Sequence, residues 1–439
     1  MNSTAALDRN PAVALRERLR AFGGSLGVRR SLVLAVAMVL AGGLDYGLNV
    51  LAGRWLAPAE YGVFVAVAAI LQVLVYLTNT IRNVVAFYTA EISAAAGSRG
   101  SVGAFLHRAW SWGWRWGLAG AALMAVLSPA LARLLRLPNA WPLWAACPAV
   151  LLFFTRTVTD GTLQGIQAFT GFGLVQVSQS LFRVLIAGAL IWLGYQASGA
   201  ILALPIACTL ALAIALWLLR PHFRDRHRSI QRPVSWHYSA YTLLGLGVFA
   251  LLTNMDAIFV KRFFDPQVAG NYGPVVTLAK IGLFLPLAMG IVLFPKVTKR
   301  VAAGRNPRPI LLLALAGTLL PGLILSSACF LFPGQLVRVL FTSAYRNPGI
   351  VLGIATFATT LYAGLNIWLN YALSLERPAF VYALAGVLLW QAVGMFLFGR
   401  ENLVAMTLTM VSAGVVGNLA GFVTTWSFVP KPAVAGAAS

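Results

Sequence analysis

Long apolar blocks with very few charged residues run through the whole chain. Of its 439 residues, 59% are hydrophobic and only 10% are charged, whereas soluble domains carry about 25% charged residues. Blocks such as 31–44, 118–127 and 310–320 extend to about 20 residues with their flanks, the length that a helix needs to cross a bilayer. They lack the alternating polarity of barrel strands. The sequence therefore predicts an all-α polytopic membrane protein.

We expect about twelve transmembrane helices. The first apolar run begins only at residue 31 and continues to about residue 52, so it is interpreted as a retained span rather than a signal peptide. The predicted spans are 31–52, 62–90, 109–131, 142–163, 172–193, 200–219, 238–260, 272–295, 310–332, 348–372, 380–398 and 403–428.

The positive charge is concentrated on one side of these spans. The net charge is +22, and the predicted spans place 20 Lys and Arg side chains on one side and 8 on the other, with the first 30 residues, the loop 220–237 and the loop 296–308 all on the richer side. Because cytoplasmic loops hold the excess of Lys and Arg, both termini are predicted to be cytoplasmic. The amphipathic arm 12–22 and the basic loops are expected to contact anionic lipids.

The chain is predicted to be a duplicated six-helix unit. Arg54 and Pro58 recur 208 residues later as Arg262 and Pro266, and each pair is followed by a Tyr-Gly dipeptide. Parallel repeats of this kind place a substrate between two lobes near the membrane midplane. The predicted parts are a basic arm (1–30), an N-lobe (31–219), a basic linker (220–237), a C-lobe (238–428) and a cytoplasmic tail (429–439).

No motif of an enzyme or a metal site is found. Cys147, Cys208 and Cys329 lie far apart inside apolar blocks, the four histidines are scattered, and no loop is long enough for a catalytic domain. Nucleophile elbows, phosphate loops and zinc spacings are not found in the sequence. We therefore expect a protein that is not an enzyme and that needs no cofactor or metal.

The segment around the end of the first span resembles a known family. Residues 48–64 read LNVLAGRWLAPAEYGVF, and 79–93 read NTIRNVVAFYTAEIS. This is similar to the polysaccharide transporter or O-antigen flippase family, in which a span ends in an R-x-L-x-P-x-x-Y-G loop. That family belongs to the multidrug/oligosaccharidyl-lipid/polysaccharide exporter superfamily. The spans, the central loop and the repeat agree with it over nearly the whole chain.

The resemblance implies a fold and a function. The fold is a two-lobed, V-shaped transporter that works by alternating access. The function that the resemblance implies is to flip polyprenyl-diphosphate-linked oligosaccharide to the periplasmic leaflet of a bacterial inner membrane for polysaccharide biosynthesis, with other polysaccharide assembly proteins as possible partners. Two alternatives are a multidrug antiporter of the same superfamily and a membrane glycan polymerase or ligase. The polymerase or ligase would need a large periplasmic loop, and none is found.

Charged residues inside spans are costly, at about 2.5–3.5 kcal/mol each near a helix centre, so they are not expected to face lipid. Several lie on polar stripes at helical spacing, which predicts a polar chamber lined largely by the first half. Arginine, lysine and amide groups suit a diphosphate and sugars. The predicted substrate-binding residues are Arg82, Arg183, Lys280, Arg156, Asn79, Gln176, Gln179 and Asn366, and Arg82, Arg183 and Lys280 are expected to converge on the diphosphate.

Several of these charges have a second interpretation. Arg156 and Asp160 are four residues apart, so they either neutralise each other or serve the substrate. Asp45 and Asp256 lie in the first span of each half, and each is either a helix–helix hydrogen bonder or an ion-coupling site. Arg115 is close to a basic helix end, where snorkelling explains it.

The charge asymmetry predicts the topology directly. A reporter fused after Arg226 is expected to lie in the cytoplasm, and one fused after Gln267 in the periplasm, because only one span separates them. Paired phosphatase and fluorescent-protein fusions measure this. The opposite result at either site would contradict the span assignment.

Overall fold

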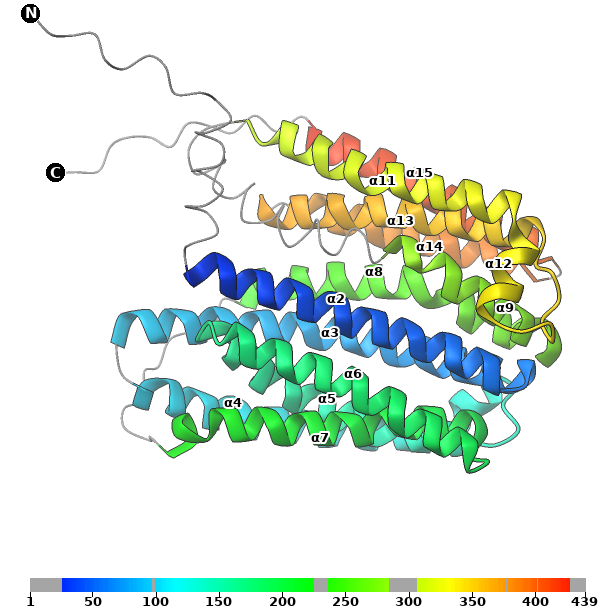
Figure 1. The fold of residues 1–439 in the computed structure, drawn as a ribbon. Helices are drawn as coiled ribbons and strands as arrows, with labels where there is room; N and C mark the ends of the chain where they lie inside the picture. The colour runs from blue at the N-terminus through cyan, green and yellow to red at the C-terminus, as the bar shows by residue number, and fades with distance from the viewer. Residues whose placement is uncertain are drawn as a thin grey trace, which may run out of the picture.

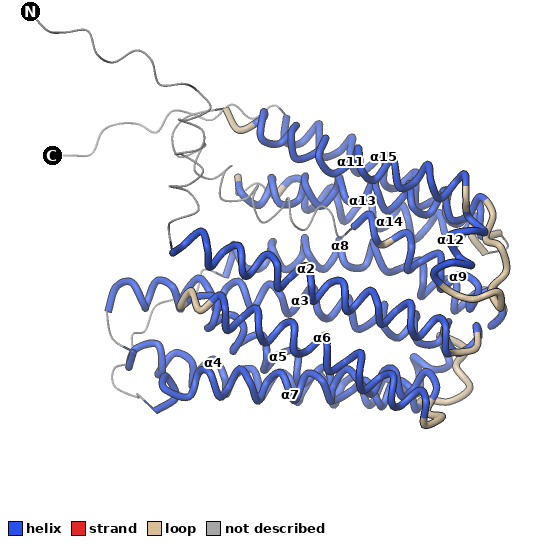
Figure 2. Tube along the Cα trace, viewed as in Figure 1, coloured by secondary structure: helices blue, strands red, loops and turns tan. Residues whose placement is uncertain are grey.

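The computed structural model describes residues 26–96, 99–224, 236–283, 306–375, 378–400 and 402–426, and these residues form thirteen helices and no strands (Figures 1 and 2). The predicted all-α polytopic fold is confirmed. The first group of helices is α2 (Leu26–Trp55), α3 (Pro58–Ala96), α4 (Arg99–Leu134), α5 (Trp141–Gly165), α6 (Phe169–Trp192) and α7 (Gln196–Arg224). The second is α8 (Trp236–Phe263), α9 (Pro266–Ala279), α11 (Arg308–Leu331), α12 (Pro333–Leu340), α13 (Ile350–Ser374), α14 (Ala379–Phe398) and α15 (Leu403–Trp426).

Eleven of the described helices are long and apolar enough to cross a membrane. They correspond to eleven of the predicted spans, although α3 and α4 continue well beyond the predicted ends. The remaining predicted span, 272–295, begins within α9, and its second half lies outside the described residues. The amphipathic segment 12–22 and the predicted tail 429–439 also lie outside the described residues, whereas residues 26–30 of the predicted basic arm belong to α2. The chain is a multi-pass membrane protein.

The helix starts follow from the sequence. Proline occupies the first position of α3, α9 and α12, where its missing N–H loses no helical hydrogen bond and its fixed φ suits the helix. The eight-residue α12 was not predicted, because it is too short and too polar for a span. It instead lies at one end of the bundle, between α11 and α13 (Figure 1).

The helices form two packed groups. Within the first group, α5 packs against α3, α4 and α7, while α6 packs against α2 and α7; within the second, α13 packs against α9, α11 and α15, and α14 packs against α8 and α15. Helix α3 of the first group packs against both α8 and α9 of the second. The seam between the two groups therefore runs along α3. The residue boundaries of the two predicted lobes stay predictions.

Small residues allow α3 and α5 to approach at backbone distance. A Cβ added to Gly161 would lie 2.7 Å from the carbonyl oxygen of Arg82, and one added to Gly165 would lie 2.6 Å from that of Ala86. Glycines four residues apart on one face are the usual means by which membrane helices pack closely. This packing fixes the depth of Arg82 relative to α5.

The two ends of the bundle differ. One end, called the α12 end here, holds α12 together with the turns that join α2 to α3 and α8 to α9 (Figure 1). The other end holds the first and last described residues. In Figure 1, α11 and α7 draw apart toward this second end. The charge asymmetry predicts that the α12 end faces the periplasm.

Replacing Gly161 by alanine is expected to destabilise the protein by about 1–3 kcal/mol, because the added methyl group collides with main-chain atoms of α3. Gly43→Ala is the matched control, since nothing lies within 4 Å of its added Cβ. Unfolding of both variants in mixed micelles measures the difference. Equal stability of the two variants would show that the α3–α5 packing is looser than described.

Candidate functional site

A buried arginine on α5 is surrounded by polar side chains from three helices. Arg156 is 6% exposed. Its Nη2 donates to Asp160 Oδ2 at 3.0 Å and to Gln176 Oε1 at 2.6 Å, and its Nη1 donates to Gln179 Oε1. Cys208 Sγ on α7 lies 3.9 Å from Nη1 and accepts from Gln179 Nε2 at 3.5 Å. The helix i,i+4 spacing brings Arg156 to Asp160, and packing of α6 supplies the two glutamines.

Some polar atoms in this region have no partner. Arg156 Nε, Asp160 Oδ1 and Gln164 Oε1 are buried without a hydrogen bond among the described residues. Buried polar atoms are nearly always hydrogen-bonded, so each such exception requires an explanation. A ligand or ordered water in a polar chamber would satisfy them. We name Arg156, Asp160, Gln176 and Gln179 the α5–α6 polar cluster.

Arg82 adds a second cation beside this cluster. It lies on α3 opposite Gly161, and the charged groups that act on it are Asp160 and Arg156. Its Nε is buried without a partner among the described residues, while the side chain as a whole is only half-buried. Arg82, Arg156 and Asp160 together supply two cations and one carboxylate. The site therefore carries an excess positive charge.

Arg183 lies in a different environment, paired with a carboxylate. Its Nη1 is 3.3 Å from Asp45 Oδ1 on α2, and Ser180 Oγ donates to Asp45 Oδ2 at 3.1 Å. The two charged side chains are 17% and 40% exposed. Ion pairing across α2 and α6 explains why both charges are tolerated within spans.

Lys280 belongs to a polar group inside the second set of helices. It follows the last residue of α9, and its Nζ donates to Asn254 Oδ1 on α8 at 2.7 Å. Asp256, also on α8 and 3% exposed, is the carboxylate that attracts Lys280 and accepts from Tyr272 Oη at 3.1 Å. Both candidate ion-coupling carboxylates, Asp45 and Asp256, therefore lie near a cation.

The remaining predicted residues have varied surroundings. Asn366 is buried, and its Oδ1 accepts at 3.0 Å from Nδ2 of Asn370, one helical turn further along α13. Asn79 is half-buried on α3. Gln167, which follows Arg156 by eleven residues, lies beyond α5 at a positive φ of 59° because α5 ends at Gly165.

The structure joins Arg156 with Gln176 and Gln179, and sets Arg82 beside them. It pairs Arg183 with Asp45 and bonds Lys280 to Asn254, so the three cations Arg82, Arg183 and Lys280 do not share one set of hydrogen-bond partners in this arrangement. Sequence analysis missed Cys208 and Gln391, whose Oε1 accepts from Tyr362 Oη at 2.6 Å. A glutamine in the middle of the apolar span 380–398 was a usable signal, whereas a cysteine in an apolar block gave none.

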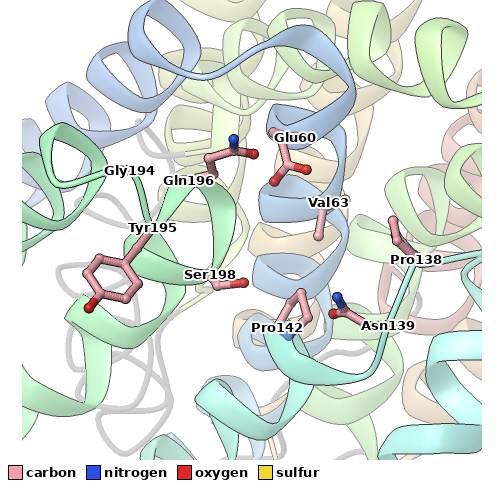
Figure 3. Close-up of a pocket in the computed structure, with 9 residues that line it drawn as sticks. All are labelled: Glu60, Val63, Pro138, Asn139, Pro142, Gly194, Tyr195, Gln196 and Ser198. Carbon is pink, nitrogen blue, oxygen red and sulfur yellow. The ribbon is translucent and has the colours of Figure 1, made fainter.

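A small pocket at the α12 end holds none of the predicted residues. Its volume is about 210 Å³, and its lining comes from the start of α3 and from the loops α4–α5 and α6–α7 (Figure 3). The carboxylate of Glu60 accepts from the backbone N–H of Ala197 at 3.3 Å there. Glu60 thus interacts favourably with the N-terminus of α7, which gives it a structural role.

Comparison with known proteins identifies the fold. No protein-family model and no curated protein matches the sequence. Among solved structures, an inward-facing multidrug resistance MATE family transporter of the MOP superfamily matches with a TM-score of 0.67 and 13% identity, over 89% of this chain and 97% of that one. The lipid II flippase MurJ, in an inward closed conformation, matches with a TM-score of 0.66 and 13% identity, over 90% and 88%.

A third similar structure is a MOP superfamily transporter from Pyrococcus furiosus, described by the reverse polarity of its binding pocket, with a TM-score of 0.61 and 14% identity over 90% of this chain and 95% of that one. The chain therefore has the fold of the MOP superfamily of transporters, the superfamily that its sequence resembles. The similar proteins are transporters and a flippase.

The Asp45–Arg183 pair is expected to act as one unit. Asp45→Asn and Arg183→Gln each leave one charge without its partner, so the double variant is expected to be more stable than the sum of the single effects predicts, by about 0.5–3 kcal/mol. A double-mutant cycle on the free energy of unfolding measures this coupling. Strictly additive effects would show that the two side chains do not interact.

Proposed function

We propose that the protein is a flippase that moves a polyprenyl-diphosphate-linked oligosaccharide from the cytoplasmic to the periplasmic leaflet of a bacterial inner membrane. The observation that carries this proposal is the excess positive charge of Arg82, Arg156 and Asp160 beside two glutamines. An anionic diphosphate neutralises that excess, and arginine binds phosphate oxygens in a bidentate manner.

The amides of the α5–α6 polar cluster suit the sugar part of such a substrate. Gln176 and Gln179 are half-buried and direct their carbonyl oxygens to Arg156. Their remaining donors and those of Asn79 are of the type that binds sugar hydroxyls. Asn366 is the corresponding candidate on α13. These roles are proposals that follow from residue chemistry and location.

The seam between the two helix groups supports entry of the substrate from the end opposite the α12 end, where the first and last described residues lie. Interlobe contacts along α3 run from Tyr61, whose Oη is 2.7 Å from Thr277 Oγ1, to Leu77, which lies against Gly247. Further along α3, Asn83 and Phe87 are exposed. We propose that this end faces the cytoplasm, as the predicted topology implies, and that alternating access carries the bound anion toward the α12 end.

Ion coupling is proposed to act through Arg183, which is paired with Asp45, and through Lys280, which is hydrogen-bonded to Asn254 and attracted by Asp256. Protonation of Asp45 or Asp256 removes the carboxylate charge that attracts the cation. A freed cation gains affinity for an anionic substrate, and substrate binding in turn favours protonation, since the coupling is reciprocal. This arrangement gives Arg183 and Lys280 a role in transport without requiring them to contact the diphosphate in every state.

A multidrug antiporter of the same superfamily is the second candidate, because a MATE family transporter matches the chain as well as the lipid II flippase does. Charge separates the two functions. A cation acts on each of three carboxylates within the described spans, which are Asp45, Asp160 and Asp256. A cationic drug would compete with these internal cations and would add to the excess charge near Arg82.

Arg82→Gln is expected to weaken binding of a polyprenyl diphosphate carrying a short oligosaccharide by at least about tenfold, because it removes a charge-assisted contact. Native mass spectrometry of the purified protein measures the bound fraction. The matched control is Arg115→Gln, which removes the same charge from an exposed position on α4.

Two results would contradict the proposal. One is equal loss of binding in the Arg82→Gln and Arg115→Gln variants, which would show only a general charge effect. The other is tight binding of a lipophilic cation such as ethidium by the parent protein, with no binding of the diphosphate lipid. The second result would favour the multidrug antiporter.

A further inference from the structure

An arginine of the first helix group caps a helix of the second group at the α12 end. Arg54, in the last turn of α2, donates from Nε to the carbonyl oxygen of Leu340 at 2.9 Å and from Nη2 to that of Val339 at 2.6 Å. These are the last two residues of α12. The carbonyl groups at a helix C-terminus have no N–H donor within the helix, and the helix dipole favours a cation there.

The loop after α12 adds further contacts with the end of α2. Tyr345 Oη donates to the carbonyl oxygen of Gly53 at 2.7 Å. Burial raises the pKa of the Tyr345 hydroxyl above its usual value, so it stays protonated and remains a donor. Phe341 fills the space beside Gly53, where a Cβ would lie 2.4 Å from its ring. The segment 333–349 therefore lies across the seam.

Next to this segment, the backbones of α3 and α9 are in direct contact across the seam. A Cβ added to Gly270 on α9 would lie 2.1 Å from the carbonyl oxygen of Pro58, and one added to Gly62 on α3 would lie 3.0 Å from the backbone nitrogen of Gly270. Gly62 and Gly270 are separated by the same 208 residues as the repeat. Opening this end for exit of any substrate requires the two glycines to separate.

The duplicated arginine does not repeat the contact. Arg262, which corresponds to Arg54 in the repeat, lies over the ring of its neighbour Phe263 at 5.6 Å, within its own helix group. The repeat therefore places the same residue type at the same end of each half, with different contacts. This difference supplies a matched control inside one molecule.

We propose that α12 and the loop to Gly349 form a clamp, locked by Arg54, that holds the α12 end of the transporter closed. Release of Arg54 from Val339 and Leu340 is the step that lets the two helix groups separate at this end. The clamp rests on the described contacts between the helix groups and does not depend on which substrate is carried.

The distance between spin labels across the α12 end tests the clamp. Leu193→Cys after α6 and Phe398→Cys at the end of α14 are exposed positions in the two helix groups, and the three buried native cysteines are replaced by alanine. In lipid nanodiscs without substrate, Arg54→Ala is expected to raise the ratio of long to short distances by about tenfold. Arg262→Ala is expected to leave that ratio unchanged.

A second pair of variants separates the lock from the seam. Gly270→Ala is expected to lengthen the distances by pushing the backbones apart, while Gly386→Ala, with open space around its added Cβ, is not. An unchanged distribution in Arg54→Ala would overturn the proposal, whatever Gly270→Ala does. An equal effect of Arg54→Ala and Arg262→Ala would also overturn it. If the distances show an intact clamp but the parent protein does not bind the polyprenyl diphosphate lipid, that result would instead count against the proposed function.

Discussion

The packing of α3 at backbone distance on two opposite partners holds the rest of the structure in place. One partner is α5, which approaches through Gly161 and Gly165, and the other is α9, which approaches through Gly270. In a bilayer, apolar side chains gain little by leaving lipid, so close contacts of this kind and buried polar contacts carry helix association. The 39 residues of α3 span about 58 Å, and both the position of Arg82 beside α5 and the seam between the helix groups depend on them.

The packing of the helices determines which charged side chains within the spans meet. A charge within a span is tolerated when it is paired or lines a polar cavity. The structure shows an ion pair at Asp45 with Arg183 and at Asp160 with Arg156, while Asp256 accepts a hydrogen bond from Tyr272 and Lys280 donates one to Asn254. Arg82 is the additional cation beside the α5–α6 polar cluster. A similar solved structure is described by the reverse polarity of its binding pocket, which suggests a different function for that transporter.

Much of the fold could be predicted from the sequence. Apolar length predicted the spans, because lipid imposes the same length on every crossing helix. Helical spacing also joined Arg156 to Asp160. The pairing of Asp45 with Arg183 could not be predicted, because the two residues are 138 positions apart and lie on different helices. Residue spacing along one helix does not show which other helices pack against it. Helix α12 was missed because eight residues at a membrane surface leave no span-length signal.

The central claim is that the Arg82–Arg156 region binds the anionic head of a lipid-linked substrate. A cryo-EM structure of the protein with a polyprenyl-diphosphate-linked oligosaccharide tests it most directly. The account predicts diphosphate density within hydrogen-bonding distance of Arg82 and Arg156, with the first sugar beside Gln176 and Gln179. Diphosphate density elsewhere in the chamber, with Arg82 and Arg156 unchanged and free of contact, would contradict it.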